Sequence, residues 1–325
     1  MIRVGVIGAG HLGRLHANLY NKVERAHLVG VYDIDTGTGQ QAAKDADCRA
    51  FQSAEELLQE VDAVNIATPT TQHFELAMQA LALGRHLFIE KPITTSVEEA
   101  DRLLARASEK NCVIQVGHIE RFNKAMRALH STAVSPMFIE SHRLATFNPR
   151  GTDVAVVLDL MIHDIDIILS LVDSPIKQID ANGVAVVSNE PDIANARIQF
   201  ENGCVANVTA SRISQKKMRK MRLFERDSYI SLDFLQGNAE RFLLSPDAPD
   251  TNPTSFAMGK MEGDRTRYIY YDKLSAPEGN ALQMELESFV DAAINGTSPV
   301  VSGMDGRKAL AVACKISQKI NAQTL

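Results

Sequence analysis

The 325-residue sequence lacks tryptophan, has only four cysteines and contains no long apolar run. Cys48, Cys112, Cys204 and Cys314 lie far apart, without a CxxC motif or a cluster with histidine, which argues against metal sites and a disulfide framework. No stretch approaches the about 18 apolar residues of a membrane-spanning helix. The net charge of -6 gives no reason to expect nucleic acid or an anionic membrane as a partner. We expect a globular protein of the reducing cytoplasm.

The N-terminal part of the sequence alternates between strand and helix patterns, and its first residues enter a strand without the basic start and apolar core of a signal peptide. Short β-branched runs (RVGVIG, HLVGVYD, DAVNIAT, HLFIEK, CVIQVGH) are separated by helical stretches, one of which opens with Ser96 and Glu99 in a capping-box pattern. Strands that alternate with helices predict βαβ units and a parallel sheet covered on both faces.

The C-terminal part reads differently, because its strands follow one another through turns, with ENG at 201–203 as a hairpin signal. Residues 151–172 form a long, apolar segment that predicts a buried helix. We therefore predict an α/β protein with two domains. Residues 1–121 form an N-terminal Rossmann domain with a doubly wound parallel sheet, and residues 122–325 form a substrate-binding and oligomerisation α/β domain with a mostly antiparallel, open sheet. The C-terminal helices can pack back on the first domain.

The predicted parallel strands end in polar or small residues. Ligands of such sheets bind at the carboxyl ends of the strands, so we expect a site there. The strand ends carry Gly8, Asp33, Thr68, Glu90 with Lys91, and Gly117 with His118. Lys91 follows an apolar strand and precedes Pro92, which favours an extended backbone at the lysine.

The first strand leads into a glycine-rich loop, Gly8-x-Gly10-x-x-Gly13, that opens a helix and contains His11 and Leu12. Glycines at this spacing allow a tight turn and close approach of a pyrophosphate to the helix N-terminus. Asp33, at the end of the second strand, would accept hydrogen bonds from the adenosine ribose and repel a 2′-phosphate. The pattern predicts a dinucleotide site that prefers NAD to NADP.

The long apolar segment carries Asp159, His163 and Asp166 at i, i+4 and i+7, so the three share one stripe of the predicted helix. A carboxylate one turn away can orient an imidazole and tune its pKa for acid–base work. The alternative is a histidine that is merely satisfied within the core.

Together these motifs resemble the Gfo/Idh/MocA oxidoreductases, and the closing segment from Met284 onward is similar as well. The resemblance implies an NAD(P)-dependent dehydrogenase acting on CH–OH groups, with Lys91 near nicotinamide and substrate, His163 as the acid–base and Asp159 beside it. It also places the loop ATPTTQH near the cofactor. The full predicted cofactor-binding set is Gly8, Gly10, His11, Leu12, Gly13, Asp33, Thr68, Pro69, His73, Glu90 and Lys91.

The sequence departs from the commoner Asp-x-Gly-x-His helix of the family, because Met161 occupies the glycine position. With VGHIERFN at 116–123, it resembles the branch that oxidises the 3-hydroxyl of UDP-N-acetylglucosamine. Alternatives are a free-sugar or inositol dehydrogenase and a catalytically silent NAD-binding sensor. We expect a homodimer or homotetramer formed through the C-terminal sheet. The predicted substrate-binding residues are His118, Arg121, Asn123, Arg143, Asp159 and His163, with Arg150 as a further diphosphate candidate.

Two groups of polar residues also have a simpler, structural interpretation. His118, Arg121 and Asn123 could merely tie the domains together. The basic stretch from Lys216 to Arg226 could serve a sugar diphosphate, but we interpret it as a solvated face or turn.

Overall fold

The computed structural model describes residues 1–130, 132–148, 154–245, 255–261 and 267–322. The chain separates into two compact units. The first comprises residues 1–122 and 279–311, and the second residues 123–278 and 312–325. Arg150 lies outside the described residues. Within the described ranges, no helix combines the length and the apolar character that a bilayer crossing requires.

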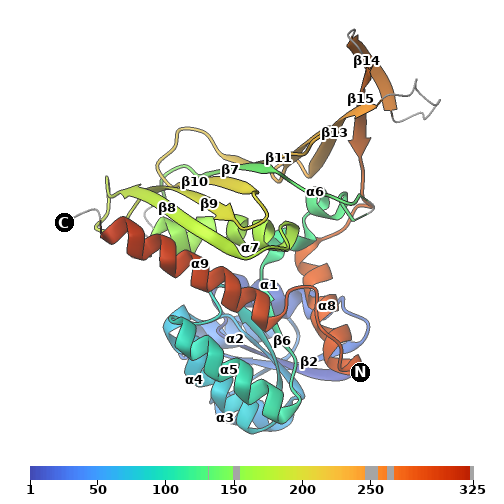
Figure 1. The fold of residues 1–325 in the computed structure, drawn as a ribbon. Helices are drawn as coiled ribbons and strands as arrows, with labels where there is room; N and C mark the ends of the chain where they lie inside the picture. Colours follow the sequence, from blue (N-terminus) through green and yellow to red (C-terminus); the bar gives the residue numbers. More distant parts are fainter. Residues whose placement is uncertain (131, 149–153, 246–254, 262–266, 323–325) are drawn as a thin grey trace. The chain divides into compact units, whose positions relative to one another are not determined.

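The first unit is built on a parallel sheet with the order β3-β2-β1-β4-β5-β6, and helices flank the strands (Figure 1). This order is that of a doubly wound dinucleotide-binding sheet, whose ligand edge is the carboxyl end of the strands. The parallel sheet predicted from the sequence is confirmed. Its strands are β1 (Ile2–Ile7), β2 (Ala26–Tyr32), β3 (Arg49–Ala50), β4 (Ala63–Ile66), β5 (His86–Glu90) and β6 (Ile114–Gly117).

The helices of this unit begin at identifiable caps. The Ser96 side chain accepts a hydrogen bond from the Glu99 N–H, and the Glu99 carboxylate accepts one from the Ser96 N–H, so the predicted capping box is confirmed. The helices are α1 (His11–Tyr20), α2 (Thr36–Asp45), α3 (Ala54–Glu60), α4 (Thr70–Ala82), α5 (Val97–Lys110), the short η1 (Ile119–Phe122), α8 (Ala281–Asn295) and, in part, α9 (Gly303–Asn321).

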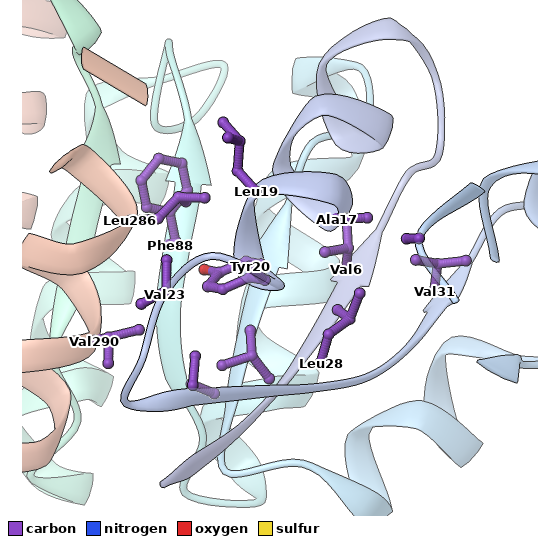
Figure 2. Close-up of a cluster of buried hydrophobic side chains, with 14 of the residues drawn as sticks. Val6, Ala17, Leu19, Tyr20, Val23, Leu28, Val31, Phe88, Leu286 and Val290 are labelled. Carbon is purple, nitrogen blue, oxygen red and sulfur yellow. The ribbon is translucent and has the colours of Figure 1, made fainter. Parts of the chain in front are cut away.

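A buried apolar cluster joins α1, the sheet and the distant α8 (Figure 2). Phe88 of β5 and Phe289 of α8 pack edge to face with ring centroids 5.9 Å apart. Leu286 and Phe289 are fully buried, so each contributes about 1.5–3 kcal/mol of apolar burial. A helix almost 200 residues away along the chain is therefore part of the core of the first unit.

The second unit contains a nine-stranded sheet with the order β14-β15-β13-β12-β11-β7-β10-β9-β8. All neighbours are antiparallel except β7 and β10, as predicted for a mostly antiparallel sheet. Gly203, at φ +90°, makes the predicted turn between β9 and β10. The strands are β7 (Phe138–Leu144), β8 (Ile176–Val184), β9 (Ile193–Phe200), β10 (Val205–Ser211), β11 (Met218–Phe224), β12 (Ser228–Asp233), β13 (Asn238–Ser245), β14 (Ser255–Met261) and β15 (Arg267–Leu274).

One face of this sheet packs against the apolar helix of the unit. The described part of the predicted helix consists of a π-helical turn, η2 (Val157–Met161), followed by α7 (Ile162–Leu171). Residues 151–153 of the predicted helix lie outside the described residues. Side chains alternate between buried and half-buried along β7 and β10, which gives the sheet two faces of different character. The short α6 (Lys124–Arg127) and the C-terminal part of α9 complete the described helices of this unit.

Candidate active site

The turn from β1 into the first turn of α1 requires glycine at two positions. Gly8 has φ +90°, and a Cβ there would lie 2.8 Å from the backbone of Ala67. A Cβ on Gly13 would lie 1.7 Å from the carbonyl oxygen of Gly8, so this glycine lets α1 pack against β1. A Cβ on Gly10 would meet nothing within 4 Å, and Gly10 caps α1 without a side-chain hydrogen bond. The N-terminus of α1 therefore faces open space, with N–H groups suited to an anion.

A cavity of about 530 Å³ lies at this edge of the parallel sheet. Asp33 lines it at the end of β2, and its carboxylate accepts hydrogen bonds from the N–H groups of Ala9 (2.7 Å) and Asp35 (2.9 Å). These hydrogen bonds fix the orientation of the carboxylate. A carboxylate has about four acceptor sites, so about two remain for a ligand. The remaining lining residues are Ile7, Gly8, Gly10, Tyr32, Ile34, Ala54, Ala67, Thr68, Pro69, Gln72, Leu76 and Gln79.

The chemistry of the cavity fits a dinucleotide. It combines a helix N-terminus for a pyrophosphate, a fixed carboxylate for ribose hydroxyls and apolar side chains for a base. The hydroxyl oxygen of Thr68 is buried and has no hydrogen-bond partner in the described part of the chain. A buried polar atom is normally satisfied, so a bound ligand is the partner we expect for it. His11 and Leu12 lie in the exposed first turn of α1.

His73, in α4, holds two loops of this edge together. It is buried, its Nε2 lies 2.9 Å from the carbonyl oxygen of Thr68, and its Nδ1 lies 3.0 Å from that of Pro92. Burial lowers the pKa of His73, although these two carbonyls oppose the shift. His73 thus connects the loop after β4 to the loop after β5, where Lys91 lies.

A row of hydrogen-bonded, buried polar side chains, which sequence reasoning missed, ends at Lys91. The Tyr20 hydroxyl donates to Asn65 (2.5 Å), and the Asn65 amide donates to Nδ1 of His16 (2.5 Å). The other ring nitrogen of His16 lies 3.1 Å from a carboxylate oxygen of Glu90, within ion-pair distance. The second Glu90 oxygen accepts from the Lys91 N–H (3.3 Å). These polar side chains therefore anchor the backbone that carries Lys91.

Glu90 is kept ionised by this row of polar side chains. Burial raises its pKa, but the hydrogen bond and charge of His16, together with the charge of Lys91, lower it below its ordinary value. A Cβ on Gly117 would lie 2.8 Å from the Glu90 carboxylate, so glycine in the neighbouring strand leaves room for the carboxylate. Lys91 itself is half-buried, and its peptide bond to Pro92 is cis.

The segment after β6 provides the next predicted residues. His118 is almost fully buried, and Arg121 is half-buried in η1; both belong to the first unit. Asn123 belongs to the second unit, where its side chain accepts from the Ala125 N–H (3.0 Å) to cap α6 and donates to the Phe234 carbonyl (3.0 Å). These two bonds give Asn123 a structural role, and its contact with a substrate stays a prediction.

In the second unit, Asp159 lies in the π-helical turn and His163 in the first turn of α7, and both are half-buried. Single π-helical turns are rare in proteins overall, but many of those that occur lie at functional sites. Asp166, the third polar residue of the predicted stripe, is buried. Asp159 lines a cavity of about 280 Å³ in this unit together with Leu160 and three basic residues.

Arg143, predicted to bind substrate, forms a buried ion pair with Asp164. Its Nε lies 2.7 Å from one carboxylate oxygen and a terminal nitrogen 3.2 Å from the other. Arg143 is 2% exposed and Asp164 1%. The pair connects β7 to α7 and uses part of the donor capacity of the guanidinium. A substrate contact of Arg143 stays a prediction.

Comparisons with known proteins agree with this architecture. The family model for the oxidoreductase family with an NAD-binding Rossmann fold, GFO_IDH_MocA, matches residues 2–118, and the GFO/IDH/MocA C-terminal domain model matches residues 126–227. The UDP-N-acetylglucosamine 3-dehydrogenase of Acidithiobacillus ferrooxidans is 37% identical over 99% of this chain and 98% of its own length. Its crystal structure, titled GnnA, superposes with a TM-score of 0.88 over the same shares of the two chains.

More distant relatives include the myo-inositol 2-dehydrogenase of Thermotoga maritima, 24% identical over 95% of this chain and 93% of its own. The scyllo-inositol dehydrogenase of Lactobacillus casei, solved with bound NAD(H) and scyllo-inositol, shares the fold with a TM-score of 0.76 at 20% identity, over 99% of this chain and 98% of its own. The glycine loop, the doubly wound sheet and both domain matches lead to one conclusion. The chain belongs to the Gfo/Idh/MocA family of NAD-binding oxidoreductases.

Proposed function

We propose that the protein oxidises a sugar hydroxyl with NAD, and that its substrate is UDP-N-acetylglucosamine, converted at C3 to the 3-keto sugar. The observation that carries this proposal is the full-length likeness to the Acidithiobacillus enzyme of that name, in sequence and in structure. The inositol dehydrogenases are less similar over the full chain.

The main residues of the predicted site have distinct roles in this proposal. Bound NAD would supply the hydride acceptor. Asp33, Thr68 and the glycine loop hold the dinucleotide, and the fixed Asp33 carboxylate favours NAD over NADP. His163 accepts the hydroxyl proton, because imidazole titrates near neutral pH, and Asp159 orients it. Lys91 donates to the substrate oxygen and stabilises developing negative charge.

A substrate panel tests this function. Purified protein is supplied with NAD and either UDP-N-acetylglucosamine, free N-acetylglucosamine, glucose or myo-inositol, and NADH formation is followed by absorbance. Because ketone formation is uphill, glutamate and a sugar aminotransferase remove the product. Turnover of the UDP-sugar alone supports the proposal. Turnover of a free polyol instead would establish the inositol or free-sugar dehydrogenase, and no turnover with retained NAD binding would establish the silent sensor.

Two variants test the chemical roles separately from folding. His163→Ala and Lys91→Met should each lower kcat by about 10²–10⁴ while leaving NAD affinity and cooperative unfolding intact. His130→Ala serves as the matched control, since His130 is exposed. If His163→Ala unfolds the protein but retains activity per folded molecule, the core-histidine alternative is correct and the acid–base role is wrong.

We also propose that the half-buried face of the nine-stranded sheet joins two copies of the chain. Five aromatic rings lie on it in register across five strands, with successive centroids 5.0–5.7 Å apart. A row of large aromatic side chains is typical of interfaces rather than of a solvated sheet face. The rings are those of Phe138, Phe224, Tyr229, Phe242 and Tyr271.

A cytoplasmic location is the last part of this proposal. All four cysteines are free thiols, as is usual in a reducing compartment.

A further inference from the structure

The cavity beside Asp159 is strongly basic. It has a volume of about 280 Å³ and lies entirely within the second unit, between the ends of β7 and β11 and the π-helical turn. Three cationic side chains and one carboxylate line it. We call it the basic cavity; its residues are Leu144, Ala145, Thr146, Asn148, Asp159, Leu160, Arg212, Lys217 and Arg219.

Arg212 is the anchored cation of the basic cavity. It is 6% exposed, its guanidinium lies 3.6 Å from the Asp192 carboxylate, and it donates to the carbonyl of Val154. Asp192 in turn accepts from the N–H groups of Val186 and Val187, both at 2.7 Å. Burial raises the pKa of Asp192, but these hydrogen bonds lower it to about 2, so the carboxylate stays charged. Arg212 therefore has a partner within the protein that holds it in place.

Lys217 and Arg219 are placed differently, because both are exposed at the rim of the cavity. Arg219 of β11 lies directly opposite Arg143 of β7 in the sheet register. Arg143 is buried and paired with Asp164, whereas Arg219 is exposed, so its guanidinium is accessible to a ligand. Two other cations of the stretch lie beside carboxylates of neighbouring strands, Lys220 beside Asp233 at 3.2 Å and Arg222 beside Glu140 at 2.8 Å.

Our interpretation of the stretch from Lys216 to Arg226 as a solvated face or turn therefore does not describe all of it. Met218–Phe224 form a central strand of the sheet, and Lys217 and Arg219 line a cavity. A cavity that concentrates positive charge at exposed side chains is suited to binding an anion.

We propose that Lys217 and Arg219 bind the phosphate groups of a nucleoside-diphosphate sugar in the basic cavity. This inference rests on the proposed function and adds the residues that recognise the activated form of the sugar. Guanidinium and ammonium groups are the usual partners of phosphate oxygens, and the planar fork of arginine suits a diphosphate. Asp159 lines the same cavity, so phosphate binding and the proposed acid–base pair would act on one ligand.

The size of the cavity agrees with this assignment. About 280 Å³ lies just below the range of pockets that enclose a whole drug-sized ligand, about 300–1,000 Å³. The cavity therefore takes part of a nucleotide sugar. A free sugar or polyol carries no charge for the two cations to bind, so the cavity discriminates against the substrates of the inositol dehydrogenases.

The test compares Lys217→Gln and Arg219→Gln with Lys216→Gln, an exposed neighbour that does not line the cavity. Each cavity variant should raise the KM for UDP-N-acetylglucosamine about tenfold to a hundredfold, since a charged hydrogen bond is lost. The inhibition constant of UDP should rise by a similar factor. The KM for NAD and the melting temperature should stay unchanged, because exposed side chains contribute little to stability. Lys216→Gln should match the wild type in every measurement.

Two outcomes would overturn the inference and are distinguishable from each other. If the wild type turns over UDP-N-acetylglucosamine and both cavity variants keep its KM and the UDP inhibition constant, the phosphates bind elsewhere and the proposed function stands. If the wild type neither binds UDP by calorimetry nor turns over any UDP-sugar, the proposed function fails, and the inference with it. Loss of UDP binding in the cavity variants, with a folded protein, supports the assignment directly.

Discussion

Replacing His16 with leucine tests whether the row of buried polar side chains that ends at Lys91 holds the first unit together. His16 is fully buried, and its ring packs edge to face against Phe88 with centroids 5.3 Å apart. Leucine keeps an apolar side chain at this position but removes both ring nitrogens. The Asn65 amide then loses its acceptor, and the Glu90 carboxylate loses its nearest positive or donating group.

The expected cost follows from these two lost contacts. An unsatisfied buried amide costs about 1–3 kcal/mol, and a lost hydrogen bond to a charged group about 1.5–3 kcal/mol. Removing one partner of a buried ion pair costs about 3–5 kcal/mol, which is consistent with their sum. For a unit of this size, 1 kcal/mol corresponds to about 2–4 °C, so the melting temperature should fall by roughly 6–20 °C.

The loss of unfolding free energy in His16→Leu should also increase with pH. In the wild type, His16 opposes the effect of burial on the pKa of Glu90. Without His16, only Lys91 opposes the effect of burial, so we expect the folded-state pKa of Glu90 to rise above its unfolded value. A group with a raised folded pKa favours folding below its unfolded pKa and loses that contribution as the pH rises through the folded pKa. His16→Leu should therefore be more destabilising at about pH 8 than at about pH 5.

Scanning calorimetry of three variants at both pH values provides the measurement. His16→Leu should show the large, pH-dependent loss, and His16→Leu with Glu90→Gln should recover part of it because no charge remains buried. His27→Leu is the control, since His27 is exposed on β2. If His16→Leu melts within about 1 °C of this control, or melts equally early at both pH values, the ion pair with Glu90 does not stabilise the unit.

Three further predictions concern cofactor choice, pH and assembly. Asp33→Ala should weaken NAD binding about tenfold to a hundredfold and narrow the preference over NADP, measured by calorimetric titration; equal wild-type affinity for both cofactors would exclude the assignment. Burial lowers the pKa of His86, whose Nδ1 accepts a hydrogen bond from the Val113 N–H at 3.0 Å. The free energy of unfolding that His86 contributes above about pH 6.5 should therefore be lost on acidification. His86→Gln should reduce this loss between about pH 7 and 5, whereas the control His130→Gln should not. Tyr229→Lys should convert the assembled protein to monomers in sedimentation velocity; an unchanged mass would place the interface elsewhere.

Much of the fold could be predicted because it depends on patterns that are local in the sequence. The glycine loop, the strand–helix alternation and the capping box at Ser96 each occupy a few adjacent residues, and the structure confirms all three. The ENG turn is equally local, since Gly203 alone supplies the positive φ. The carboxyl ends of parallel strands lie at one edge of the sheet, so the polar residues at these ends predicted a ligand site at that edge.

Features that depend on distant contacts could not be predicted. The π-helical turn around Asp159 differs from an α-helix by one hydrogen-bond register, which no residue pattern specifies. The pairing of Arg143 with Asp164 joins a strand to a helix, so sequence alone offered Arg143 as a ligand for phosphate. A signal for the row of buried polar side chains was available, because Asn65 interrupts an apolar strand, but its partners lie on other elements.

The charged residues of the chain therefore divide by burial. Arg143 and Arg212 are buried, and each lies beside a carboxylate, because an uncompensated charge would cost several kcal/mol. Lys217 and Arg219 are exposed at a cavity, where solvent reduces the cost of holding a charge and a ligand can reach it. Residue type does not distinguish the two classes, since arginine occurs in both. Burial distinguishes them, and it supports the proposal that Lys217 and Arg219, beside the start of β11, bind phosphate; a substrate contact of Arg143 stays a prediction.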